Sequence, residues 1–183
     1  MRNLLEATIA DVREAAQNDS ALLVSPTHVL AAAQAPHVAT VAGYPTGRHH
    51  SLIKASEARL AVQSGAAEVW VAVDALLGDA TALLTDLITV REACPQPVAL
   101  GLIVPSSEHA AAAARAAAQA GFDKLIYATQ EHLAEAETQI AREPAGVLPA
   151  LVWPTAQPAL VWPTAQPALV WPTAQPALVW PTA

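Results

Sequence analysis

Short apolar runs alternate with longer segments of helical periodicity through most of the chain. The apolar runs are rich in β-branched residues and predict buried strands at Ala21–Val24, Val38–Ala42, Glu68–Val73, Val98–Val104 and Lys124–Tyr127. The segments beside them predict helices over Leu4–Gln17, Val29–Gln34, the stretch from Ser51 to Gly65, Ala80–Cys94, Glu108–Ala120 and Glu131–Arg142. Regular alternation of strand and helix predicts an α/β fold whose parallel strands are joined by right-handed crossovers.

The pattern changes at Ala150, where the unit Ala-Leu-Val-Trp-Pro-Thr-Ala-Gln-Pro begins and then recurs every nine residues to the end of the chain. Two prolines in each unit exclude a regular helix and a central strand, so we expect an extended or disordered tail. The copies do not differ, which favours a recent duplication over a selected interaction tail. We therefore divide the chain into an α/β portion, 1–149, and a repeat tail, 150–183, although Val147–Trp153 could also form a sixth strand.

Composition narrows the function classes. The 183 residues carry a net charge of −7 and a single cysteine. Net acidity and the lack of a Lys/Arg cluster argue against a nucleic-acid partner. No stretch is long and apolar enough to cross a membrane, and no secretory leader is evident, so we expect a cytoplasmic protein without a membrane partner. Neither a metal nor a cofactor is predicted.

Three motifs in the middle of the chain keep a distinctive order and spacing. They are Gly43-Tyr44-Pro45-Thr46-Gly47, then Ile53-Lys54-Ala55-Ser56-Glu57-Ala58, then the run from Gly65 to Asp74. Together with Leu22-Leu23-Val24-Ser25-Pro26 they resemble the deoxyribose-phosphate aldolase family. That resemblance implies a (β/α)8 barrel of the TIM type and a lyase. Family members cleave 2-deoxyribose 5-phosphate reversibly into acetaldehyde and glyceraldehyde 3-phosphate through a lysine Schiff base.

The resemblance predicts an incomplete barrel of about five to six βα units. The family's first strand has no counterpart here beyond Met1–Leu5, and its last strands would follow Arg142, where the repeat begins. A whole barrel of this type needs at least about 200 residues. We therefore expect either a partial barrel whose open edge pairs with another subunit, as a homo- or hetero-oligomer, or a truncated reading frame.

Each family catalytic position that can be placed carries a different residue type. The resemblance puts Ile126 at the Schiff-base lysine, Gly101 at the second lysine and Trp70 at the aspartate. No catalytic residue is therefore assigned with confidence. Lys124 is a weak candidate, because side chains alternate along a strand and Lys124 points to the same face as Ile126.

Other candidate groups are few. Lys54 is the other of the two lysines in the chain, and we expect it to be solvated or packed on a helix. If the family positions are level, Lys124 and Asp74 lie roughly 20 Å apart along the barrel axis, beyond the reach of both side chains. Arg48, beside His49 and His50 on the loop after the Gly43–Gly47 motif, could meet the phosphate of a sugar phosphate. The two histidines lack a third metal ligand.

Three hypotheses for function remain open. The first is an active deoxyribose-phosphate aldolase, which the substituted catalytic positions make doubtful. The second is a non-catalytic relative that binds a sugar phosphate or pairs with a homologue through its open edge. The third is a truncated or decayed gene product.

Overall fold

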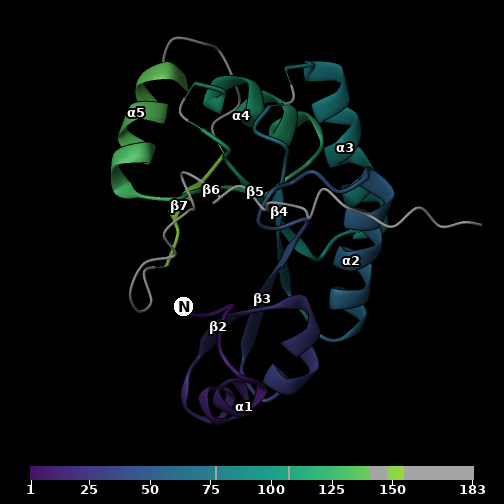
Figure 1. The fold of residues 1–183 in the computed structure, drawn as a ribbon, viewed down its shortest axis with the longest axis vertical. Coiled ribbons are helices and arrows are strands. Elements are labelled where there is room, and N and C mark those ends of the chain that lie inside the picture. Colours follow the sequence, from purple (N-terminus) through teal and green to yellow (C-terminus); the bar gives the residue numbers. More distant parts are fainter. Residues whose placement is uncertain (77, 107, 141–147, 155–183) are drawn as a thin grey trace, which may run out of the picture.

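Seven parallel strands form one curled sheet in the computed structural model, which describes residues 1–76, 78–106, 108–140 and 148–154 (Figure 1). The strands follow one another in the sheet in chain order: β1 (Arg2–Leu4), β2 (Ala21–Val24), β3 (His37–Ala42), β4 (Glu68–Ala72), β5 (Ala99–Ile103), β6 (Lys124–Tyr127) and β7 (Ala150–Val152). The predicted partial barrel is confirmed as a half-barrel.

Helices connect the strands and cover the outside of the curled sheet (Figure 1). They are α1 (Ile9–Asn18), the 3-10 helix η1 (Pro26–Ala32), α2 (Ser51–Gln63), α3 (Ala80–Ala93), α4 (Ala110–Gln119) and α5 (Gln130–Ile140). Local signals fix several helix starts. Thr8 and Asp11 form a capping box at α1, and the Asp79 carboxylate accepts a hydrogen bond from the Thr81 backbone amide at α3.

The structure differs from the main prediction at both ends of the sheet. Arg2–Leu4 pairs with β2, so a first strand exists and the helix predicted from Leu4 begins only at Ile9. At the other end the first repeat copy supplies β7, as the sixth-strand alternative allowed, with Leu151 beside Ile126. The proline at 154 follows the strand, so it removes no hydrogen bond from the three strand residues. The rest of the predicted tail lies outside the described residues.

Buried side chains form three clusters, two in the helix layer and one on the inner face of the sheet. The larger outer cluster packs α2, α3, α4 and α5 against β4, β5 and β6, and the smaller packs α1 and η1 against β1, β2 and β3. The inner cluster has seven buried members: Leu23, Ala39, Val41, Trp70, Ala72, Ile103 and Ile126. Because the inner face of a parallel barrel is where its catalytic side chains originate, this third cluster contains the positions of interest.

Candidate functional site

The indole of Trp70 dominates the inner face of the sheet. Trp70 is fully buried on β4 and is the register partner of Gly101 on β5. A Cβ atom added to Gly101 would lie 3.0 Å from Trp70 Cδ1 and 3.1 Å from Ile126 Cγ1. The glycine therefore provides the space that the indole and the isoleucine occupy. Trp70 therefore faces the inner side of the sheet, and no side chain projects from position 101.

The first repeat copy adds a second tryptophan to this inner face. The Trp153 ring stacks on Tyr44 with centroids 5.6 Å apart and planes 19° apart. It meets the edge of Trp70 at 5.2 Å and 66°. Tyr44 belongs to the loop after β3, so three aromatic rings from distant parts of the sequence close together over the inner cluster. Burial raises the pKa of the Tyr44 phenol above its usual value, with a smaller contribution from Glu6. Its hydroxyl therefore stays protonated at neutral pH.

Lys124 lies at the other end of the inner face, where it pairs with Glu68. The ammonium Nζ is 2.9 Å from Glu68 Oε1, which also accepts a hydrogen bond from the Trp70 indole N–H. His37 Nε2 lies 3.2 Å from the second carboxylate oxygen. Burial alone would raise the pKa of Glu68, but the hydrogen bonds from Trp70 and Lys124 outweigh it and the pKa falls below its usual value. Glu68 is thus a buried, ionised carboxylate.

Sequence reasoning missed this cluster because it assumed the wrong register. It treated Trp70 and Ile126 as level, whereas the sheet pairs Trp70 with Gly101 and Gly101 with Lys124. Lys124 is therefore in register with Trp70 through Gly101, and its amine reaches Glu68, two residues before Trp70 on β4. Strand alternation was the available signal, since Glu68 is two residues before Trp70 and must share its face.

The register shortens the predicted offset between Lys124 and Asp74 from roughly 20 Å to the four residues from Trp70 to Asp74, about 13 Å along the strand, and each residue has another partner. Asp74 lies after β4 and accepts a hydrogen bond from Arg48 Nε at 3.2 Å. The Leu76 backbone amide and then Arg48 lower the pKa of Asp74 below its usual value. The cation that could have met a phosphate at this edge is therefore engaged with a carboxylate of the same chain.

Lys54 is not solvated, which leaves only the packing role for it. Its side chain extends from α2 and is almost fully buried, with Nζ donating to the Asp86 carboxylate on α3. The same amine donates to the Gly47 carbonyl at 3.1 Å and the Ala72 carbonyl at 3.3 Å. Lys54 therefore ties the loop after β3 and the end of β4 to the helix layer.

The tight loop from Gly43 to Gly47 depends on this buried lysine. A Cβ added at Gly43 would lie 2.4 Å from Lys54 Cδ, and one at Gly47 would lie 2.1 Å from the Val73 carbonyl carbon. Both glycines have a positive φ, 69° and 68°, that other residues rarely adopt. The Gly43 amide also donates to Glu57 Oε2 at 2.7 Å. The conformation of this loop therefore requires glycine at both of its ends.

Of the two histidines after the Gly43–Gly47 loop, His50 has a structural role. Its Nδ1 accepts a hydrogen bond from the Leu52 amide at 3.2 Å and so caps α2, whereas His49 is exposed. Within the described ranges no three His, Cys, Asp or Glu side chains are grouped closely enough to hold a metal ion. Among those same residues no helix is long and apolar enough to cross a membrane.

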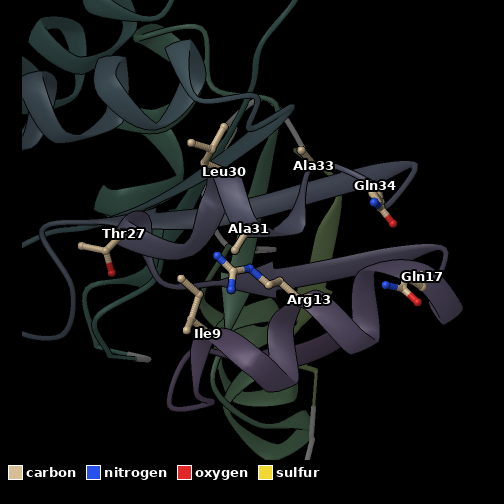
Figure 2. A pocket seen from close by; sticks show the side chains of 8 residues that line it. All are labelled: Ile9, Arg13, Gln17, Thr27, Leu30, Ala31, Ala33 and Gln34. Atoms are coloured by element: carbon tan, nitrogen blue, oxygen red, sulfur yellow. The ribbon is translucent and has the colours of Figure 1, made fainter.

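A cavity of about 420 Å³ lies away from the inner face, between α1 and η1 in the helix layer (Figure 2). Ile9, Leu30 and Ala31 give it apolar walls, and Arg13 extends along it. Gln17 and Gln34 lie at one end of the cavity in the same view. None of the residues predicted to carry chemistry lines this cavity, so it is separate from the candidate site.

Comparison with known proteins places the scaffold. No family model matches the chain. The chain is 50% identical over 102 residues to the deoxyribose-phosphate aldolase of Corynebacterium jeikeium, covering 52% of this chain and 41% of the relative. It is 44% identical over 146 residues to that of Mycolicibacterium paratuberculosis, covering 69% of this chain and 65% of the relative. The chain is a relative of the deoxyribose-phosphate aldolases.

The fold agrees with this relationship. Deoxyribose phosphate aldolase from Aeropyrum pernix superimposes with a TM-score of 0.68 at 17% identity, over 77% of this chain and 70% of that one. The chain spans about two-fifths to two-thirds of the length of the two curated aldolases above. The predicted resemblance to this family and the partial barrel are thus confirmed.

Proposed function

We propose that this chain is a non-catalytic relative of the deoxyribose-phosphate aldolases, whose barrel interior is filled by its own side chains. The observation that carries the proposal is Ile126. The family resemblance implies the Schiff-base lysine at this position, and the isoleucine is fully buried in the inner cluster with Trp70. An alkyl side chain cannot form an imine, so the central step of the family reaction has no nucleophile there.

Neither lysine of the chain is available to replace it. A Schiff-base lysine must present a neutral amine to its substrate, which favourable contacts with anions oppose. Lys54 is held by Asp86 and two carbonyl oxygens, and Lys124 by Glu68. Both amines are therefore engaged by oxygen atoms of the same chain, and the rings of Trp70 and Trp153 pack together on the inner face.

Borohydride trapping with acetaldehyde tests this proposal. An imine between acetaldehyde and a lysine is reduced by borohydride to a stable N-ethyl amine, which intact mass and peptide mapping detect. We expect no more adduct than on a denatured sample, with the Corynebacterium jeikeium relative as the positive control. Stoichiometric labelling of Lys124 or Lys54 at neutral pH, abolished by the corresponding Lys→Gln variant, would overturn the proposal.

The open edges of the sheet favour a second proposal, that the chain pairs with another subunit. Within the described part of the chain β1 and β7 each have one neighbouring strand. Unpaired strand edges favour pairing with a further strand. Light scattering over a dilution series tests this. We expect a mass above that of the 19.0 kDa chain that falls on dilution, and a monomer at every concentration contradicts it for self-pairing.

Sugar-phosphate binding has less support. Arg48 is the cation beside the strand ends, and Asp74 already engages it. Calorimetric titration with 2-deoxyribose 5-phosphate measures any binding of the sugar phosphate to the chain. We expect no saturable heat, because a phosphate would have to displace the carboxylate without a replacement cation among the neighbouring described residues.

A further inference from the structure

Among the described residues, a five-residue segment, Pro149–Trp153, makes the backbone hydrogen bonds and ring contacts of the β7 edge. The Pro149 carbonyl accepts from the Leu125 amide at 2.9 Å, and the Trp153 amide donates to the Tyr127 carbonyl at 2.7 Å. Between them the three strand residues pair with β6. The Trp153 ring then supplies the contacts with Tyr44 and Trp70. Pro-Ala-Leu-Val-Trp therefore supplies both the backbone pairing and the ring contacts at this edge of the sheet.

The same five residues occur three more times in the chain. They are Pro158–Trp162, Pro167–Trp171 and Pro176–Trp180, each followed by proline as in the first copy. Each could make the same backbone hydrogen bonds to β6 and the same ring contacts, because the segments are chemically identical. We propose that the edge beside β6 is a docking site for which the four copies compete, so that Pro158–Trp162 can replace Pro149–Trp153 as the seventh strand.

Two differences set the balance between the copies. Leu148 packs on the outer cluster, and the residue at its place in the later copies is glutamine. The connection from α5 also lengthens, from nine residues (141–149) for the first copy to 18 residues (141–158) for the second. Doubling a loop lowers the population by only about threefold. The first copy is thus favoured, and the docked populations of the later copies are only moderately lower.

The exchange is expected within one chain. A segment tethered by a short linker is present at an effective concentration in the millimolar range. Another chain at micromolar concentration competes poorly against that. The occupant we assign is accordingly the next copy of the same molecule, and a segment from a second molecule is the alternative that the experiment separates.

Four full-length chains test the exchange through their equilibrium unfolding: wild type, W153A, the triple variant W162A/W171A/W180A, and the quadruple variant that adds W153A. With exchange, W153A lowers the folding equilibrium constant by about three- to tenfold, because a later copy takes over. The quadruple variant lowers it by about a hundredfold or more, as expected for losing a packed tryptophan. The triple variant, the matched control, changes it by about twofold or less.

The comparison between W153A and the quadruple variant decides whether the later copies dock beside β6. If W153A is as unstable as the quadruple variant, or if both fail to fold, the later copies do not dock and the proposal is overturned. A folded W153A beside an unfolded quadruple variant supports it. Equal stability of all four chains overturns it as well, since the tryptophan would then not hold the strand. If the advantage of W153A over the quadruple variant disappears on dilution, the strand comes from a second molecule, which overturns the intrachain form.

Discussion

Trp70 and Gly101 are cross-strand partners in which the indole of one fills the side-chain space of the other. The distance of 3.0 Å between a Cβ at 101 and Trp70 Cδ1 is tighter than ordinary van der Waals contact. The family resemblance predicts an aspartate position at Trp70 and a lysine position at Gly101, and the two residues present are complementary in size. A large residue on β4 is accommodated by the absence of a side chain on β5.

Gly101→Ala is expected to destabilise the protein. The new methyl group would be forced against Trp70 and Ile126 in a packed interior, which costs about 1–3 kcal/mol. Urea unfolding measures this loss. Gly78→Ala is the matched control, because a Cβ at Gly78 meets nothing within 4 Å. If the penalty arises from the indole, it should shrink when Trp70 is first replaced by leucine, and a penalty that stays constant in that background contradicts the pairing.

Removing Lys54 alone should be among the most damaging substitutions. Lys54→Met leaves the Asp86 carboxylate buried without its cation, which costs about 3–5 kcal/mol. The double variant Lys54→Met/Asp86→Leu should recover much of that loss, because no uncompensated charge remains. Guanidinium unfolding of both chains measures the difference.

An exposed ion pair provides the control for this experiment. Arg2 Nη1 lies 3.0 Å from Asp19 Oδ2, and half of the arginine side chain is exposed. Arg2→Gln should leave the unfolding midpoint almost unchanged, as surface pairs do. A double variant at 54 and 86 that is no more stable than Lys54→Met would show that the lysine acts mainly by filling space next to Gly43.

The buried carboxylate of Glu68 predicts a pH dependence of stability. Its pKa in the folded chain lies below the ordinary value of 4.5, because hydrogen bonds from Trp70 and Lys124 outweigh the effect of burial. A lowered carboxylate pKa adds stability that is present above 4.5 and is lost as the pH falls through the folded pKa. Unfolding free energy measured between about pH 6 and pH 3 should therefore fall more steeply for wild type than for Glu68→Gln.

Other carboxylates contribute to acid unfolding, so only the difference between the two chains is informative. Asp11 and Asp74 also have lowered pKa values, Asp11 through its hydrogen bond with Thr8, and both remain in the Glu68→Gln chain. Parallel pH profiles for wild type and variant would contradict the role assigned to Glu68.

The sequence alone determined five of the seven strands in the described sheet and the resemblance to the aldolase family. Alternating apolar and amphipathic segments were sufficient for five strands and their helices, because burial on both faces requires continuous apolar runs. The Gly43–Gly47 motif carried much of the family resemblance. Glycine is required at both ends of the motif, because Lys54 approaches Gly43 closely and the Val73 backbone approaches Gly47 closely. The assignment of Trp70, Gly101 and Ile126 to the catalytic positions of the family stays a prediction.

Only the tertiary structure decided which side chains meet. The register of β4, β5 and β6 brings Lys124 to Glu68, and a single assumed level for Trp70 and Ile126 was enough to hide that pair. Trp153 could not be placed on the inner face from a proline-rich repeat, because the strand before it, Ala150–Val152, forms by pairing with β6. Strand register and edge pairing depend on contacts between residues far apart in the chain, and local sequence does not encode them.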